Sequence, residues 1–220
     1  RPGNAPVFMG YDFHLGPEGP RLIEVNTNAG GALLNGLHTA ALCDPVKLAC
    51  RCRDLLPVET MEQRIVRTFR AELEAVRGPG AVLQPLGIAD DATVQQFLKS
   101  EFTLFRELFA RAGIDALVCD TREIPLQDGV QLVYLRDTDF LLETERTAAL
   151  RRAYLEDRVV VTPAPREHHL LANKGRLALF SDAAALRKLG LPPEEADFLA
   201  QIVPESVPLE GLGLERAWSE

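Results

Sequence analysis

The chain has 220 residues, of which 46% are hydrophobic, so it is long enough to bury a sizeable core in one or two domains. Its formal net charge of -8 disfavours a nucleic-acid partner, because a phosphate-backbone binder needs a basic surface. No apolar run approaches the ~20 residues of a membrane span, and the first residues lack the pattern of a signal peptide. We therefore expect a cytoplasmic protein with no nucleic-acid or membrane partner.

The first predicted element is a β-hairpin. Apolar and polar residues alternate over residues 7–15, which is typical of a strand, and residues 21–28 form the second strand. Between them, residues 16–20 are rich in Gly and Pro and predict the turn.

Three polar side chains give this hairpin its chemical interest. If Leu15 pairs with Arg21, Asp12 lies directly across from Glu24 on the polar face. Two carboxylates in this arrangement repel each other unless a cation or a basic side chain lies between them. Oxygen ligands such as those of Glu24 and Asn26 suit a hard cation like Mg²⁺. The alternative is an ordinary solvated polar face of a half-exposed sheet.

Helices and a parallel sheet are predicted further along the chain. Asp44-Pro45 is a helix start signal, and a later amphipathic helix is expected to end at Gly78. Residues 80–140 then follow a strand, helix, strand pattern, with the helix over residues 92–112 and two short apolar strands after it. This pattern predicts a small α/β unit with a parallel sheet.

The last third of the chain is predicted to be mainly helical. It contains an arginine-rich helix near residues 144–156, a short strand with the sequence VVVTP, and helices that begin at Asp182 and at Pro192-Pro193. With no secretory signal, none of the four cysteines is expected to form a disulfide; they are Cys43, Cys50, Cys52 and Cys119.

Three segments occur in the chain in a specific order. They are GYDFH with LIEVNTNAGG, then VYLRDTDF, and finally TPAPREHHLLANKGRLAL. In this order they resemble three blocks of the circularly permuted ATP-grasp enzymes typified by eukaryotic-type glutathione synthetase. Gly10 stands where that family has an arginine that binds the dipeptide substrate, so we expect a product other than glutathione.

The resemblance implies an α/β, ATP-grasp-like fragment with a small parallel α/β substrate-binding domain. Residues 1–79 would belong to the ATP-grasp core, residues 80–140 would form the substrate-binding domain, and residues 141–220 would lead into the nucleotide-binding part. The Gly-rich lid and the last metal-binding glutamate of the family have no counterpart before Glu220. We therefore expect that the C-terminal part of the natural protein is missing and that this fragment is inactive alone. Because the sequence does not begin with Met, we expect that the native N-terminus is missing as well.

The reaction implied by the resemblance is the ATP- and Mg²⁺-dependent joining of a small-molecule carboxylate to an amine through an acyl phosphate. Glu24 and Asn26 would bind the metal, and Lys174 and Asn26 would contact ATP. Arg136 and Asp12 would be catalytic. The substrate-binding residues would be Asn28, Gly30, Gly31 and Asp139.

Each of these assignments has a simpler alternative. Arg136 ends a predicted buried strand and is therefore expected at the carboxyl edge of the sheet, where ligands bind in open α/β sheets. Its planar guanidinium suits a carboxylate or a phosphate, but it could instead pair with Asp137 or Asp139. Lys174 could be a solvated surface residue, and the glycine pair Gly30-Gly31 could mark a turn rather than an anion site. A non-catalytic nucleotide- or metabolite-binding relative is the alternative function, and a homodimer is one open alternative for the assembly.

Overall fold

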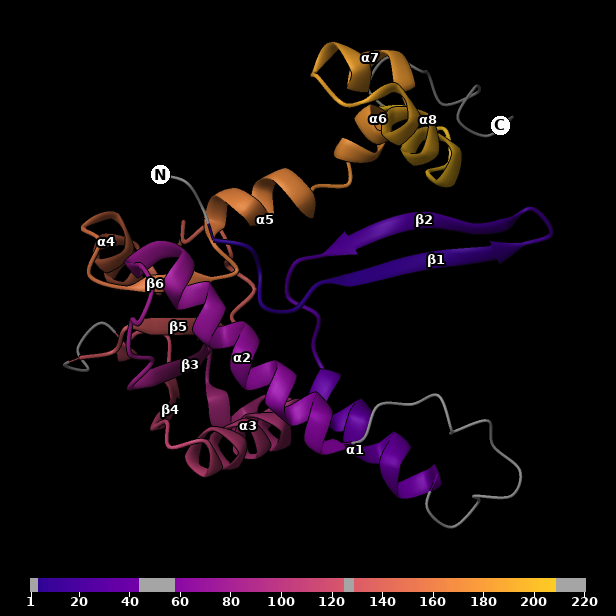
Figure 1. Ribbon diagram of the computed structural model, residues 1–220. Helices are drawn as coiled ribbons and strands as arrows, with labels where there is room; N and C mark the ends of the chain where they lie inside the picture. Colours follow the sequence, from indigo (N-terminus) through magenta and orange to yellow (C-terminus); the bar gives the residue numbers. More distant parts are fainter. Residues whose placement is uncertain (1–3, 44–57, 125–128, 209–220) are drawn as a thin grey trace. The chain divides into compact units, whose positions relative to one another are not determined.

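The computed structural model describes residues 4–43, 58–124 and 129–208, and the chain divides into two compact units (Figure 1). The first unit contains Arg1–Phe8 and Asn28–His168, and the second contains Met9–Thr27 and His169–Glu220. The helix start predicted at Asp44-Pro45 lies outside the described residues, and so do two of the four cysteines. None of the described helices is both long and apolar enough to cross a membrane.

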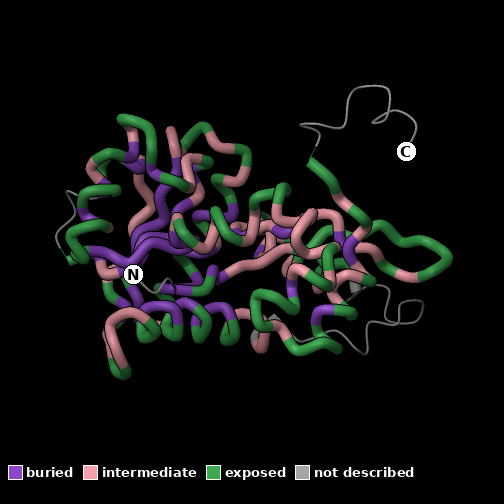
Figure 2. Tube along the Cα trace, turned by 90° about the horizontal axis from the view of Figure 1, so that it is seen from above, coloured by how far each residue is buried: buried purple, intermediate pink, exposed green. Residues whose placement is uncertain are grey.

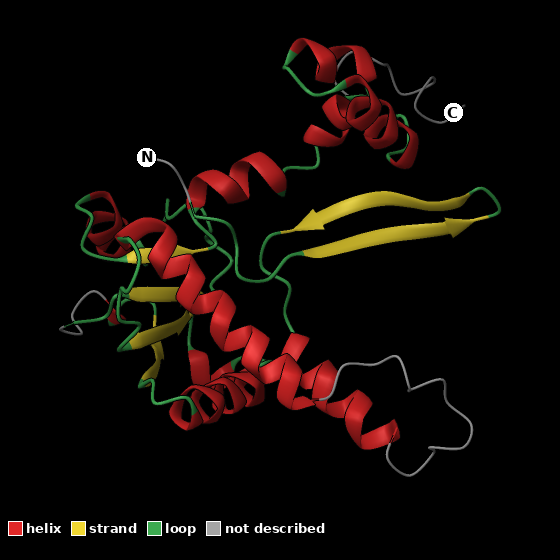
Figure 3. Cartoon of the chain, viewed as in Figure 1, coloured by secondary structure: helices red, strands yellow, loops and turns green. Residues whose placement is uncertain are grey.

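A parallel sheet of four strands, in the order β4-β3-β5-β6, forms the centre of the first unit (Figure 3). The strands are β3 (Leu86–Asp90), β4 (Ala116–Asp120), β5 (Leu132–Leu135) and β6 (Val160–Thr162). The helices are α1 (Ala32–Cys43), α2 (Val58–Arg77), α3 (Lys99–Arg111), α4 (Ala148–Leu155) and the short 3-10 helix η2 (Thr93–Gln95). The predicted α/β class and its parallel sheet are confirmed, and the predicted VVVTP strand joins the sheet as β6.

Both faces of this sheet are covered, as the near-continuous apolar runs of its strands require. Strands β3, β5 and β6 are buried along their whole length. Figure 2 shows the buried residues of the chain in purple. Leu132 and Tyr134 of β5 pack into one cluster with residues of α2 and α3. Val133 and Leu135, which alternate with them, pack into a second cluster with Leu150 of α4.

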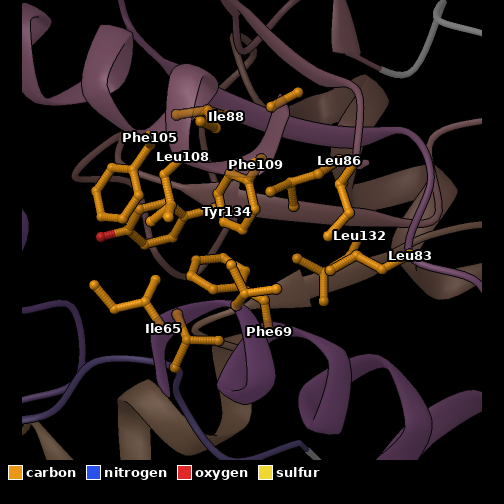
Figure 4. Close-up of a cluster of buried hydrophobic side chains, with 14 of the residues drawn as sticks. Ile65, Phe69, Leu83, Leu86, Ile88, Phe105, Leu108, Phe109, Leu132 and Tyr134 are labelled. Carbon is orange, nitrogen blue, oxygen red and sulfur yellow. The ribbon is translucent and has the colours of Figure 1, made fainter. Parts of the chain in front are cut away.

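Four aromatic rings fix β5 against the helices (Figure 4). Phe69 of α2 lies 5.0 Å from Phe109 of α3 and 5.3 Å from Tyr134, between ring centroids, and both pairs meet edge to face. Phe105 of α3 lies 5.7 Å from Tyr134. Such pairs are worth about 0.5 to 1.5 kcal/mol each beyond their buried area, so they hold the strand that leads into Arg136.

The ends of two helices agree with the sequence. Gly78 follows α2 and Gly113 follows α3, each with the positive φ that glycine adopts at low cost. The helix predicted over residues 92–112 begins later than expected, at Lys99. The reason is that Ala92 adopts a left-handed conformation and the next residues form η2.

The second unit combines a hairpin with short helices. The hairpin consists of β1 (Gly10–Gly16) and β2 (Gly19–Asn26), and the helices are α6 (Arg176–Phe180), α7 (Ala183–Lys188) and α8 (Pro193–Ile202). The boundary between the units falls within α5 (Pro165–Leu171). The predicted starts of α7 and α8 are confirmed, since Asp182 caps α7 and Pro193 is the first residue of α8.

The hairpin has the predicted pairing at its polar residues but not at its tip. Asp12 pairs with Glu24, as expected. Leu15 pairs with Pro20 rather than with Arg21, so the register assumed at the tip was wrong. The turn is therefore shorter than the five residues predicted.

A bulge in β2 reconciles the two registers. The register shifts after Asp12, and Phe13 pairs with Leu22, which leaves Ile23 as an extra residue. Leu22 and Val25 are both buried although they lie three residues apart. In a regular strand Ile23 and Val25 would lie on the same face, but the bulge places Leu22 instead of Ile23 in the core of this unit.

Candidate functional site

Arg136 follows directly after β5, at the carboxyl edge of the parallel sheet, as the sequence predicted. Its backbone N–H donates a hydrogen bond to the carbonyl of Ala89 in β3 at 2.7 Å. The chain therefore stays beside β3 for one residue past the strand, which places Arg136 between the carboxyl ends of the two central strands.

This position is the point where the connections of the sheet diverge. From β3 the chain passes through α3 to β4 on one side, and from β5 it passes through α4 to β6 on the other side. In open α/β sheets, ligands bind outside the carboxyl ends of the strands at such a point. The topology thus favours the neighbourhood of Arg136 as a ligand site.

One end of the guanidinium of Arg136 is held by its neighbours. Nη1 donates to the backbone carbonyl of Asn28 at 3.1 Å, to the side-chain oxygen of Asn28, and to the hydroxyl of Tyr134 at 3.2 Å. Asn28 is held in turn, because its Nδ2 donates to the carbonyl of Leu135 at 2.9 Å. Among the described residues, no hydrogen bond or ion pair involves Nη2 or Nε of Arg136, so these donors are available to a ligand.

Gly30 is required by this arrangement for a steric reason. A Cβ atom at this position would lie 2.5 Å from Nη2 of Arg136 and 2.9 Å from Cδ1 of Leu98. The loop can approach the guanidinium only because residue 30 has no side chain.

The backbone N–H of Gly31 donates a hydrogen bond to a carboxylate side chain of the protein itself. Glu101 of α3, which is 1% exposed, accepts hydrogen bonds from the backbone N–H groups of Gly31 at 2.9 Å and Leu33 at 3.0 Å. The first N–H groups of α1 are thereby satisfied. No local pattern in the sequence predicts this contact, since Glu101 is about 70 residues further along the chain.

The two aspartates that follow Arg136 have other partners. Asp137 is fully buried and accepts two hydrogen bonds from Arg146, at 2.7 and 2.8 Å. Burial raises the pKa of Asp137, but hydrogen bonds, first of all from Arg146, outweigh it and hold the pKa below its usual value. The alternative in which Arg136 pairs with Asp137 or Asp139 is therefore wrong for the described residues, none of which forms an ion pair with Arg136.

Asp139 is occupied by the turn that precedes α4. Its carboxylate accepts hydrogen bonds from the hydroxyls of Thr144 at 2.7 Å and Thr147 at 2.6 Å, and from the backbone N–H of Glu143 at 3.0 Å. Burial raises the pKa of Asp139, but the hydrogen bonds, first of all from Thr147, outweigh burial and lower the pKa to about 2. The geometry gives Asp139 a structural function in the turn, and substrate binding by this side chain stays a prediction.

Asp90 is a candidate that the sequence reading missed. It is the last residue of β3 and is 8% exposed. Burial raises its pKa, the charge of Asp137 raises it further, and the charge of Arg136 lowers it. The available signal was its position, because a carboxylate that ends a buried strand of a parallel sheet lies at the ligand-binding edge.

The second unit holds a separate group of charges on the hairpin. Asp12 is exposed and lies across from the half-buried Glu24. Nζ of Lys174 lies 3.3 Å from Oε2 of Glu24. The basic partner that two facing carboxylates require is therefore present, because Lys174 lies beside this polar face. Asn26, which pairs with Gly10, lies two residues beyond Glu24 on the same strand.

These side chains do not by themselves make up a complete set of metal ligands. Within the described ranges, no group of three or more His, Cys, Asp or Glu side chains could hold a metal ion. Two carboxylates and one amide oxygen nevertheless match the way in which Mg²⁺ is held, through one or two carboxylates together with substrate phosphates. Asp12, Glu24 and Asn26 thus fit a metal ion that is also bound by a nucleotide.

The predicted site residues are distributed over both units. The first unit contains Asn28, Gly30, Gly31, Arg136 and Asp139, and the second contains Asp12, Glu24, Asn26 and Lys174. No protein-family model matches the chain, and no curated protein matches it significantly. The resemblance to circularly permuted ATP-grasp enzymes thus remains a prediction based on the three sequence segments.

Proposed function

We propose that the protein is an ATP- and Mg²⁺-dependent ligase that joins a small carboxylate to an amine through an acyl phosphate. The observation that supports this most is the hydrogen bonding of the Arg136 guanidinium. Its Nη1 is immobilised by Asn28 and Tyr134, and its other donors have no partner among the described residues. A pre-oriented arginine with two available donors at the edge of a parallel sheet suits a carboxylate substrate.

The proposed reaction has two steps. A carboxylate oxygen of the acid attacks the γ-phosphorus of ATP, the bond to the β-phosphate oxygen breaks, and an acyl phosphate and ADP are formed. The amine then attacks the acyl carbon, phosphate leaves, and the nitrogen loses one proton. In both steps Arg136 would orient the carboxyl group and offset the negative charge that develops on its oxygens.

The nucleotide side of the reaction would use the charges of the hairpin. Glu24 and Asn26, with Asp12 opposite, would hold Mg²⁺, and Lys174 would contact a phosphate of ATP. Bound Mg²⁺ supplies neutralisation of the phosphoryl group during transfer. In the ion pair between Lys174 and Glu24, the lysine side chain is 69% exposed and the glutamate side chain is 32% exposed. Separating such a pair costs about 0 to 1 kcal/mol. Lys174 can therefore leave Glu24 for a phosphate at little cost.

A second candidate function is a binding protein that does not turn over its ligand. The same ion pair favours it, because Lys174 compensates the charge of Glu24 without any metal. Such a protein would keep the Arg136 site and lack ligase activity.

The release of ADP by the intact protein distinguishes the two functions. We expect ADP release with Mg-ATP only when an acid and an amine are both supplied, with the common amino acids used as both. Arg136→Lys keeps the charge but loses the planar fork, so kcat/KM for the acid should fall by about tenfold or more. Arg151→Gln, on the exposed side of α4, is the matched control and should leave kcat/KM unchanged.

The binding protein predicts a different result. It would bind an acid or Mg-ATP, with affinity reduced by Arg136→Lys in the first case, and would release no ADP with any pair of substrates. A protein that binds neither compound would contradict both functions.

A further inference from the structure

A groove lies between α2 and α3 in the first unit. Its volume is about 550 Å³, within the range of roughly 300 to 1,000 Å³ that is usual for small-molecule sites. The lining residues come from successive turns of the two helices: Glu62, Gln63, Val66, Arg67, Arg70, Leu108, Arg111 and Ala112. None of these residues belongs to the surroundings of Arg136 or to the charged group on the hairpin.

The floor of this groove is apolar. Val66 and Leu108 are buried core residues, and Ala112 directly follows α3. Leu108 and Ala112 are four residues apart, so they present neighbouring surfaces to the groove. An apolar part of a ligand that lies on this floor is shielded from water on the side that faces the protein, and this burial favours binding.

The rim of the groove is positively charged, although the whole chain carries a net charge of -8. It has three arginines and a single carboxylate, Glu62, which pairs with Arg111 at 2.7 Å. Arg70 donates one long hydrogen bond, of 3.4 Å, to the carbonyl of Ala112. Arg67 has no ion-pair partner within the part of the chain that the structure covers. Two positive charges thus remain uncompensated beside the apolar floor.

We propose that this groove binds an amphipathic organic anion. The apolar body of the ligand lies on Val66, Leu108 and Ala112, and its head group, a carboxylate or a phosphate monoester, binds Arg67 and Arg70. These two arginines are three residues apart on α2 and so lie on the same side of the helix, one turn from each other. Their guanidinium groups can bind the oxygens of one head group together.

Calorimetric titration of the intact protein with three matched probes tests this proposal. The probes are decanoate, decyl phosphate and 1-decanol, each below its critical micelle concentration. We expect both anions to bind more tightly than 1-decanol, with an affinity that falls as salt is added. The tighter of the two anions identifies the head group that the arginines favour.

Variants assign the binding to this groove. Replacing both Arg67 and Arg70 by Gln should weaken binding of the anions by about tenfold or more, the effect of losing charged hydrogen bonds. Gln63→Glu places a carboxylate four residues before Arg67, which favours the helix and competes with the ligand. It should weaken binding by about threefold or more without lowering the melting temperature. The control variant Arg151→Gln should bind as the wild type does.

Three outcomes of these titrations would overturn the proposal. They are equal binding of 1-decanol and decanoate, unchanged affinity in the Gln63→Glu variant, and absence of binding by both anions. Binding of an acidic amphipathic peptide in place of either anion would also overturn it, since that ligand belongs to a different class.

Discussion

At the scale of single residues, Arg136 depends on neighbours that are distant in the sequence. Asn28 and Gly30 lie more than 100 residues before it, yet the first holds its Nη1 and the second leaves room for its Nη2. Tyr134, two residues earlier, contributes its hydroxyl and its ring, whose centroid is 5.4 Å from Cζ. The sequence could identify the arginine but not the constraint on it.

Substitution of Gly30 tests this constraint. In Gly30→Ala the new Cβ would lie 2.5 Å from Nη2, so the Arg136 side chain must move. We expect a loss of stability of about 1 to 3 kcal/mol, the usual cost of overpacking, measured by urea unfolding. Gly16→Ala is the control, because the nearest atom to its Cβ would be at an ordinary 3.9 Å. Equal stability of the Gly30→Ala variant and the wild type would show that the close approach does not exist.

At the scale of elements, a buried carboxylate joins α2 to the N-terminal segment and β6. Glu72 of α2 is 5% exposed and accepts a hydrogen bond from Nδ2 of Asn4 at 2.5 Å. The same Nδ2 donates to the carbonyl of Val161 in β6 at 3.0 Å. Burial raises the pKa of Glu72 to about 7. Hydrogen bonds from Asn4 and Thr162 lower it in part, and the charge of Glu167 raises it.

This pKa determines how stability should depend on pH. The folded protein holds the proton of Glu72 up to about pH 7, whereas the unfolded chain releases it near 4.5. The contribution of Glu72 is therefore fully present below pH 4.5 and is lost as the pH rises to about 7. Glu72→Gln should remove this dependence and be more stable than the wild type at pH 8, by on the order of 2 to 3 kcal/mol. Unfolding free energies at pH 5 and pH 8 measure it, and an identical pH dependence of the two proteins would contradict it.

The start of α7 gives a second test at this scale. The side chain of Asp182 accepts hydrogen bonds from the backbone N–H groups of Ala184 and Ala185, at 2.9 and 3.0 Å. Asp182→Ala should cost about 1 kcal/mol in thermal or urea unfolding, and Asp182→Asn should cost less, because asparagine also caps helices. If both variants lost the same stability, the capping hydrogen bonds would not be the cause.

At the scale of the whole molecule, local patterns predicted the elements and long-range contacts decided the rest. Alternation and glycine placement predicted the parallel sheet, and they predicted the position of Arg136 at its edge. They could not predict the bulge at Ile23, because it is set by which side chains the α6–α8 helices can bury. The contacts of Glu101 with Gly31 and of Lys174 with Glu24 likewise join residues about 70 to 150 positions apart.

The central claim is that the hairpin binds a nucleotide together with its metal ion. Calorimetric titration of the intact protein with Mg-ATP tests this claim most directly. Glu24→Gln keeps the volume of the side chain and removes one charge, so it should weaken Mg-ATP binding by about 1 to 3 kcal/mol. Its melting temperature should hardly change, because an ion pair with the exposed Lys174 contributes at most about 1 kcal/mol. Glu18→Gln, at the tip of the same hairpin, should bind as the wild type does. If the wild type has no Mg²⁺-dependent affinity for ATP, or if Glu24→Gln lowers the melting temperature and leaves that affinity unchanged, the claim is wrong.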